Sequence, residues 1–250
     1  MTGLDNSAWE SWAAFIKSEF GLTVGETALG QFKALFAELT EWNQKLNLIS
    51  FKSGEELLYR HFADSLSCLK LLNNLGASAE NLNVIDIGTG AGFPGLPCKI
   101  MMPGWKMTFV ESITKKCDFI SQAARKLSLD NAFVVNKRAE ELAQLKEYRA
   151  VFDLLLSRAV TKLQPNIEIS IPFIKTGSLA VIYKTEKTAT PGELALAGNA
   201  LSELKARLRE GFTYSIPGQE NKYTVLAFEK FAETPLKYPR KTGVPEKKPL

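Results

Sequence analysis

The sequence predicts an α/β fold in which a doubly wound, largely parallel sheet follows a helical N-terminal segment. From residue 83 onward, short β-rich runs alternate with helical stretches, as in sheets built from repeated strand–helix units. Four glycines lie within eight residues directly after the first of these runs. Before residue 80, apolar residues recur mainly at helical spacing. Together these observations indicate one sheet-based domain with a helical extension in front of it.

The N-terminal segment should form three helices, at residues 5–20, 26–46 and 55–73. In the second, Phe32, Leu35 and Leu39 follow the spacing of a core-facing stripe. The third carries Arg60 and Asp64, four residues apart, a spacing that favours an ion pair on one helix face. It also holds His61, the only histidine, which we interpret as a structural residue because its neighbours are apolar.

The remaining elements can be placed by their periodicity. The expected strands are 83–87, 106–110, 132–135, 152–156, 179–183 and 223–228, and the expected helices are 96–102, 114–127, 163–174 and 193–210. We expect three segments: a helical extension packed on the core (1–80), a main domain (81–234) and a basic, proline-rich tail (235–250). Ligands of such sheets bind beyond the carboxyl ends of the strands, so the residues that follow each strand matter most.

Composition limits the function classes. The chain has 250 residues, and 45% of them are hydrophobic, enough for a proper core. No apolar run reaches the ~20 residues of a membrane span, and the N-terminus lacks the features of a secretory signal. The three cysteines, Cys68, Cys98 and Cys117, are widely spaced. We therefore expect a reduced cytoplasmic protein without a metal site, in which Cys98 is a buried packing residue.

The glycine-rich loop allows two readings. Gly90-x-Gly92-x-x-Gly95 matches the dinucleotide-binding pattern and would suit a nicotinamide- or flavin-dependent oxidoreductase. In the second register, an acid at the strand end, Asp86, is followed by glycines at positions 88, 90 and 92, as in S-adenosylmethionine-dependent methyltransferases. We prefer the second register because it begins where the apolar run ends.

Polar residues follow the later strands too. Glu111 lies 21 residues beyond Gly90, where an acid can accept both ribose hydroxyls of an adenosine. Residues 136–140, after the third strand, could bracket an adenine. Arg158 follows the fourth strand and should face the reaction centre or a cofactor carboxylate.

The tail carries the whole net charge of +4, because it holds five basic residues and one acidic residue. Its prolines argue against a helix or a central strand. One interpretation is an extended arm that contacts nucleic-acid phosphates. The other is a solvated extension, or a strap that packs through Tyr238 and Leu250.

These motifs, in this order, resemble the RsmG family, also called glucose-inhibited division protein B (GidB). The resemblance rests on Trp42-Asn43…Asn47-Leu48, Arg60-His61-x-x-Asp64-Ser65, the run from Asp86 to Gly95, Glu111-Ser112, Ser157-Arg158-Ala159 and the tail from Lys237 to Leu250. It implies a Rossmann-like class I methyltransferase sheet that uses S-adenosyl-L-methionine to form 7-methylguanosine in 16S ribosomal RNA. It also implies a cytoplasmic enzyme whose partner is 16S rRNA, free or within the 30S subunit or an assembly intermediate, with no metal. A non-catalytic RNA-binding assembly factor remains the third alternative.

The resemblance also implies site residues. Cofactor contacts are expected at Gly88, Phe93, Glu111, Ser112, Ile113, Ala139, Glu140 and Arg158. The expected catalytic residues are Arg158, Arg60 and Asp64. RNA contacts are expected at Lys184, Lys237, Arg240, Lys241, Lys247 and Lys248. Many members have Leu-Lys-Gly after the fifth strand, whereas this chain has Tyr183-Lys184-Thr185, which keeps the lysine alone.

Overall fold

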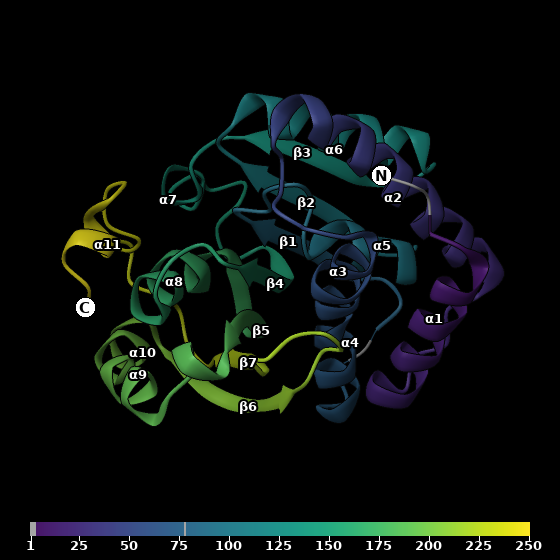
Figure 1. Ribbon diagram of the computed structural model, residues 1–250. Helices are drawn as coiled ribbons and strands as arrows, with labels where there is room; N and C mark the ends of the chain where they lie inside the picture. The colour runs from purple at the N-terminus through teal and green to yellow at the C-terminus, as the bar shows by residue number, and fades with distance from the viewer. Residues whose placement is uncertain (1–3, 78) are drawn as a thin grey trace.

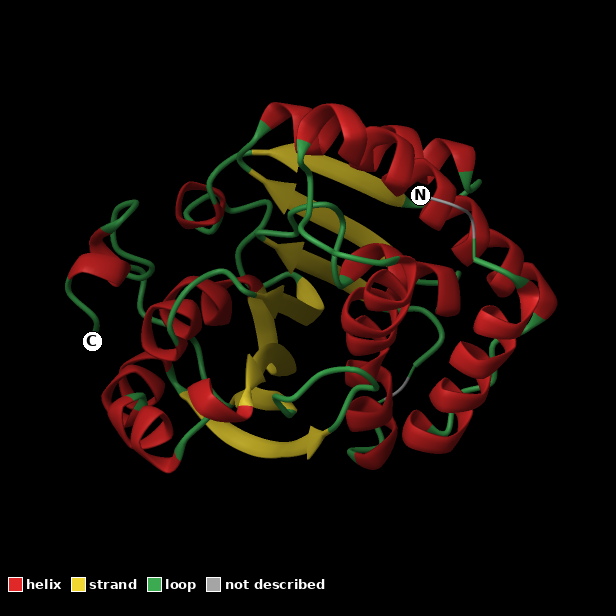
Figure 2. Cartoon of the chain, in the orientation of Figure 1, coloured by secondary structure: helices red, strands yellow, loops and turns green. Residues whose placement is uncertain are grey.

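A computed structural model describes residues 4–77 and 79–250 of the chain, so residues 1–3 of the expected extension lie outside it. A seven-stranded sheet forms its centre (Figures 1 and 2). The strands are β1 (Asn83–Ile87), β2 (Lys106–Glu111), β3 (Ala132–Asn136), β4 (Phe152–Arg158), β5 (Ile174–Thr185), β6 (Ala206–Tyr214) and β7 (Tyr223–Lys230). The α-helices are α1 (Asn6–Phe20), α2 (Glu26–Leu46), α3 (Gly54–Glu56), α4 (Asp64–Asn74), α5 (Gly95–Met101), α6 (Thr114–Lys126), α7 (Ala139–Leu142), α8 (Leu163–Ser170), α9 (Pro191–Leu196), α10 (Gly198–Leu204) and α11 (Val244–Lys247).

The strand order is β3-β2-β1-β4-β5-β7-β6. The first five strands in this order pair in parallel, and β7 pairs antiparallel with both β5 and β6. The sheet therefore has the predicted doubly wound arrangement. The topological switch point, at which the strand order reverses, lies between β1 and β4. The ends of these two strands, followed by Gly88 and carrying Arg158, are therefore neighbours.

One expected element is wrong. The predicted helix 193–210 breaks up into α9 and α10, which ends at Leu204, and the chain then becomes the edge strand β6. Lys205 reverses the chain with a left-handed backbone (φ 62°). The run Leu201, Leu204 and Leu208 has helical spacing, which misled the prediction. β6 is largely exposed and carries charged residues, as edge strands commonly do, so it lacks the apolar alternation of a half-buried strand.

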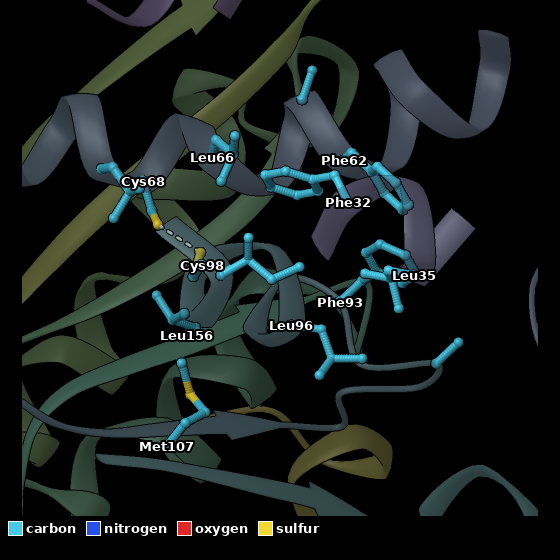
Figure 3. Packing of buried hydrophobic residues seen from close by; sticks show 14 of the residues in the cluster. Phe32, Leu35, Phe62, Leu66, Cys68, Phe93, Leu96, Cys98, Met107 and Leu156 are labelled. Atoms are coloured by element: carbon cyan, nitrogen blue, oxygen red, sulfur yellow. Dashed lines mark hydrogen bonds between the residues drawn. The ribbon is translucent and has the colours of Figure 1, made fainter. Parts of the chain in front are cut away.

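Two apolar clusters cover the two faces of the sheet. One joins α1, α2, α4, α5 and α6 to alternate strand residues such as Met107 and Leu156, and the other lies under α8 and α10. Figure 3 shows Phe93 of the glycine loop among Phe32, Leu35 and Phe62 from the N-terminal helices. The helical extension thus packs on the core, and it forms one wall behind the glycine loop.

The predicted helix 55–73 has an irregular middle. Ser53 caps α3 by accepting a hydrogen bond from the Glu56 amide, and residues Leu57–Ala63 form a π-helical segment, η1, before α4 begins. π-helical turns inside α-helices are frequently found at functional sites. The expected Arg60–Asp64 pair is not formed, because Arg60 pairs with Glu56 at 2.6 Å. Asp64 instead faces Arg158 of β4.

The basic tail packs against the domain (Figure 1). Arg149 donates hydrogen bonds to the carbonyl groups of residues 234, 235 and 238, and Arg240 binds the fully buried Glu168 with its backbone and its guanidinium. Contrary to the expectation of no helix, residues 244–247 form the short helix α11 beside α8. Pro245 is accommodated in its first turn, where its missing N–H costs no hydrogen bond. These contacts agree with the strap interpretation.

Candidate functional site

The glycine loop begins where the methyltransferase register places it, because β1 ends at Ile87 and Gly88 is the first loop residue. Asp86 is fully buried, and its Oδ2 accepts hydrogen bonds from Thr89 Oγ1 (2.5 Å) and the Gly95 amide (2.8 Å). Its Oδ1 has no partner among the described residues. Burial raises the pKa of Asp86 to about 7. Asp86 therefore ties the first and last parts of the loop together.

The middle of the loop is open to a ligand. Gly90 has a φ of +62°, and nothing lies within 4 Å of the position a Cβ would take. Its amide donates to Glu111 Oε2 at 3.0 Å, and the Ile113 amide donates to Oε1 at 2.9 Å. These bonds fix the Glu111 carboxylate at the carboxyl end of β2. A carboxylate has about four acceptor sites, so two remain for ribose hydroxyls.

A cavity of about 120 Å³ lies at these strand ends. It is lined by Gly88, Val110, Glu111, Ser112, Lys137, Arg138, Ala139, Glu140, Val160, Thr161, Ile169 and Glu246. Five of the predicted cofactor residues therefore come together: Gly88, Glu111, Ser112, Ala139 and Glu140. Ligand pockets usually measure about 300–1,000 Å³, so this cavity has room for one part of a cofactor. Glu246 belongs to the tail, and the Thr161 hydroxyl donates to it at 3.4 Å.

The other three predicted cofactor residues lie outside that lining. Phe93 and Arg158 are in contact, with the guanidinium 5.1 Å from the ring centroid. The Ile113 amide holds Glu111, while its side chain is 45% exposed. Phe93 and Arg158 thus belong to a second cluster beside the loop, on the side of β4.

Arg158 is the centre of this second cluster. Its Nη1 donates to Asp64 Oδ2 at 2.9 Å and lies 3.4 Å from the Ser65 hydroxyl oxygen. The arginine side chain is 14% exposed and that of Asp64 is 6% exposed. The expected catalytic residues Arg158 and Asp64 are therefore a nearly buried ion pair. Arg60, the third, points outward and is 44% exposed.

His61 holds the other end of the guanidinium. Its Nε2 lies 3.2 Å from the Ser50 carbonyl oxygen, so Nε2 carries the proton. Nδ1 is then free to accept from Arg158 Nη2 at 3.4 Å. Burial and the neighbouring Arg158 and Arg60 lower the pKa of His61 to about 3. The imidazole is therefore neutral, and its Nδ1 holds one end of the Arg158 guanidinium.

The second oxygen of Asp64 is held by a residue that sequence reasoning missed. The Tyr214 hydroxyl donates to Asp64 Oδ1 at 2.5 Å and lies 2.9 Å from Ser67 Oγ. Burial raises the pKa of Asp64, while Arg158 and Tyr214 oppose this shift. The Arg158 guanidinium and the two accepted hydrogen bonds favour the carboxylate form of Asp64. Tyr214 lies on β6, the strand that was predicted as part of a helix.

The predicted cysteine environment is confirmed for Cys98, which is fully buried. Its sulfur lies 3.5 Å from that of Cys68, and it donates to the Ser65 carbonyl oxygen at 3.3 Å (Figure 3). Burial raises the pKa of its thiol well above the ordinary value. Cys98 is therefore a packing residue between α4 and α5.

The predicted RNA-binding cations fall into two groups. Arg240 pairs with Glu168 and Lys237 with Glu203, and Lys184 donates to the Thr161 carbonyl oxygen at 2.8 Å. Lys241, Lys247 and Lys248 are exposed and form no ion pair within the described ranges. The first group stabilises the fold, and the second remains available to a partner.

Two features are absent from the described part of the chain. None of its helices is long and apolar enough to span a membrane, and none of its His, Cys, Asp and Glu side chains form a group that could hold a metal ion. A cavity of about 310 Å³ lies at the opposite edge of the sheet, lined by residues such as Leu72, Asp153 and Gly177. It faces the wrong strand ends for a cofactor.

Known proteins resemble this chain along most of its length. A family model described as "GidB: rRNA small subunit methyltransferase G" matches residues 28–208. The ribosomal RNA small subunit methyltransferase G of Carboxydothermus hydrogenoformans is 36% identical over 236 residues, covering 93% of this chain and 96% of that protein. The protein of the same name from Streptococcus sanguinis is 38% identical over 230 residues, covering 92% and 94%.

Solved structures share the fold at low sequence identity. TrmN from Thermus thermophilus has a TM-score of 0.51 and 17% identity, covering 70% of this chain and 53% of its own. A mutant of MtNAS in complex with S-adenosylmethionine has a TM-score of 0.53 and 16% identity, covering 90% and 78%. These likenesses show that the overall fold is shared with solved structures.

Proposed function

The chain belongs to the GidB family of rRNA small subunit methyltransferases, and we propose that it methylates N7 of a guanosine in 16S rRNA. Family membership makes it an S-adenosylmethionine-dependent methyltransferase of 16S rRNA. The proposal adds the acceptor atom and the roles of individual residues.

The observation that carries the proposal is the closed hydrogen bonding of the cluster around Arg158. His61 is neutral, with Nδ1 turned toward Arg158, and both oxygens of Asp64 are occupied. No described side chain of this cluster is free to remove a proton. An amino or hydroxyl acceptor would have to lose a proton, whereas guanine N7 has a lone pair and none to lose. A site that positions its acceptor without a base therefore suits N7.

The described residues fit the cofactor. When bound, S-adenosylmethionine supplies a methyl group on a positively charged sulfur. We assign its binding to Gly88, Phe93, Glu111, Ser112, Ile113, Ala139, Glu140 and Arg158. The open position at Gly90 and the two unused acceptor sites of Glu111 support this assignment. Gly88 has a further constraint, because an added Cβ would lie 2.7 Å from Val160 Cγ2 at a φ of +60°.

The oxidoreductase alternative loses its basis in the structure. Its register requires β1 to run into Gly90, but β1 ends at Ile87. Family membership points the same way. The alternative of a non-catalytic assembly factor makes a different prediction in the assay below, namely RNA binding without methyl transfer.

The direct test incubates the chain with 16S rRNA and labelled S-adenosylmethionine, and maps the label by borohydride reduction and aniline cleavage, which cut RNA at 7-methylguanosine. We expect one cleavage site. Label that resists this cleavage would contradict N7 as the acceptor.

The cofactor assignment has a separate test. Glu111→Gln should weaken S-adenosylhomocysteine binding by about 1.5–3 kcal/mol if the hydrogen bonds to the ribose are charge-assisted. Glu141→Gln is the matched control, because Glu141 lies on α7 outside the cavity lining.

For the RNA partner, we propose that Lys241, Lys247 and Lys248 contact phosphates, in free rRNA or in a 30S subunit or its assembly intermediate, in the cytoplasm. Replacing all three with alanine should reduce the salt dependence of RNA binding by up to about one slope unit for each lysine–phosphate pair removed. Arg240→Ala should instead lower the melting temperature, because it leaves Glu168 buried without a cation. If the salt dependence of RNA binding is unchanged in the triple variant, these lysines do not contact phosphates, and the tail only packs on the domain.

A further inference from the structure

A groove lies on the other side of Arg60 from the cofactor cavity. It has a volume of about 760 Å³, within the range of small-molecule sites. Its walls come from the start of η1, the end of β5, the start of β7 and the loop before β7. The lining residues that the inference uses are Glu55, Tyr59, Arg60, Thr185, Glu220 and Tyr223.

The groove is adjacent to the reaction centre. Thr185 stands two residues beyond Tyr183, which is the register partner of Arg158 across β4 and β5. Tyr223 stacks on Tyr214 with ring centroids 6.1 Å apart, and Tyr214 holds Asp64. The Asp64–Arg158 pair is thus one side chain behind the groove wall. Val160 and Thr161, which follow Arg158 closely in the chain, line the cofactor cavity.

Two half-buried aromatic side chains line the groove. Tyr59 packs on Phe15 with ring centroids 5.4 Å apart, and Tyr223 is held by its stack on Tyr214. Both rings are therefore fixed from behind while part of each remains exposed. Proteins recognise unpaired RNA bases by stacking them on such rings.

The polar groups of the groove can read a base edge. Glu55 and Glu220 are exposed and form no ion pair or hydrogen bond in the described part of the chain. A carboxylate accepts from the N1–H and N2 amino group of guanine, which adenine does not present in the same way. Arg60 uses Nη1 for Glu56 and lies beside Tyr223, and its side chain is 44% exposed, so that it can also reach a phosphate.

We propose that this groove holds the acceptor guanine of an unpaired RNA segment, stacked on Tyr223 and Tyr59, with Glu220 or Glu55 binding its Watson–Crick edge. Binding of that edge leaves N7, on the opposite edge, free of contacts to the two carboxylates and able to accept the methyl group. Selection of guanine would then come from the groove, while the Arg158–Asp64 pair supports the groove wall through Tyr214 and Tyr223. This inference rests on the proposed function.

The test measures GMP, IMP and AMP binding by titration calorimetry with the full chain saturated in S-adenosylhomocysteine, and the KM for 16S rRNA. GMP should bind more tightly than IMP, which lacks the N2 amino group, and more tightly than AMP. Tyr223→Ala should raise the GMP dissociation constant and the KM about 5- to 150-fold, the equivalent of ~1–3 kcal/mol for one stacked base. Tyr223→Phe should restore both, because it keeps the ring.

Matched controls separate the groove from general effects. Phe133→Ala removes an exposed aromatic ring from β3, outside the groove, and should change neither value. Glu220→Gln and Glu55→Gln together should abolish the preference for GMP over IMP, whereas Glu186→Gln, outside the lining, should keep it. Equal binding of the three nucleotides by the native chain, or unchanged binding and KM in Tyr223→Ala, overturns the proposal. GMP binding that depends on Tyr223 without methyl transfer to N7 contradicts the proposed function and leaves the groove assignment standing.

Discussion

Two buried carboxylates flank the site, and their surroundings are opposite in kind. Asp86, under the glycine loop, meets only neutral donors, the Thr89 hydroxyl and the Gly95 amide. Asp64, beside η1, meets the Arg158 guanidinium and the Tyr214 hydroxyl. Burial raises the pKa of both, to about 7 for Asp86, but Asp64 has a cation that opposes the shift.

The different surroundings of Asp86 and Asp64 show that the two halves of the site are held together in different ways. On the cofactor side, Asp86 accepts from one backbone amide and one hydroxyl, so the loop is shaped by short-range hydrogen bonds within a single strand–loop–helix unit. On the acceptor side, an ion pair joins α4 to β4, and a third element, β6, completes it. Removing one partner should therefore have larger consequences on the acceptor side, because a bare charge would be left behind.

The largest effect is expected for Arg158→Ala. It leaves Asp64 buried without its cation and should lower the free energy of unfolding by about 3–5 kcal/mol, besides reducing methyl transfer. Arg158→Lys should recover much of the stability and little of the activity, because lysine keeps the charge and loses the planar fork. Urea unfolding and methyl-transfer rates measure the two effects.

The double variant Arg158→Ala/Asp64→Asn provides the control, since it removes the orphaned charge as well. It should be more stable than Arg158→Ala alone. If the two are equally stable, Asp64 is not held as a carboxylate, and the contrast with Asp86 disappears.

The second effect concerns pH. The folded-state pKa of Asp86, about 7, lies above the ordinary value of 3.8, so the folded chain binds this proton more tightly than the unfolded chain. Its contribution to stability is complete below pH ~4 and is lost as the pH rises toward 7, because stability falls wherever the folded state binds more protons. Asp86→Asn should remove this loss. Between pH 4 and pH 7 the native chain should therefore lose unfolding free energy relative to Asp86→Asn. The stability of the variant minus that of the native chain should rise over this range. A difference that is independent of pH would show that the carboxyl has an ordinary pKa.

The sequence predicted the placement of the residues around the glycine loop better than that of the residues around Arg158, and the contrast explains why. Asp86, Gly90 and Glu111 stand at the ends of neighbouring strands, and their roles follow from local patterns of strand, loop and helix. The Arg158–Asp64 pair joins residues 94 positions apart, and Tyr214 is 150 positions from Asp64. No local pattern encodes such distances. The i, i+4 spacing instead favoured Arg60 as the partner of Asp64.

The tail illustrates the same limit. Its charge was counted correctly from the sequence, whereas its prolines did not prevent the short helix α11. Charge alone does not separate a cation that is paired from one that is free. Glu168 lies 72 positions before Arg240 and takes up that cation. Lys241, the next residue, remains exposed. The division between fold-stabilising and available cations therefore required the tertiary structure.

The smallest effects compare two hydroxyl deletions. Tyr214→Phe removes the donor to Asp64 Oδ1, and Thr89→Val removes the donor to Asp86 Oδ2. At pH 6 the first should cost about 1.5–3 kcal/mol, because the deleted bond is to an ionised group, and the second about 0.5–1.5 kcal/mol, because Asp86 is then mostly protonated. At pH 8.5 Asp86 is ionised, so the cost of Thr89→Val should rise toward that of Tyr214→Phe, whose cost should not change. Urea unfolding at the two pH values measures both. If Thr89→Val costs the same at pH 6 and pH 8.5, Asp86 does not change its protonation in this range, and its neutral surroundings do not set its pKa.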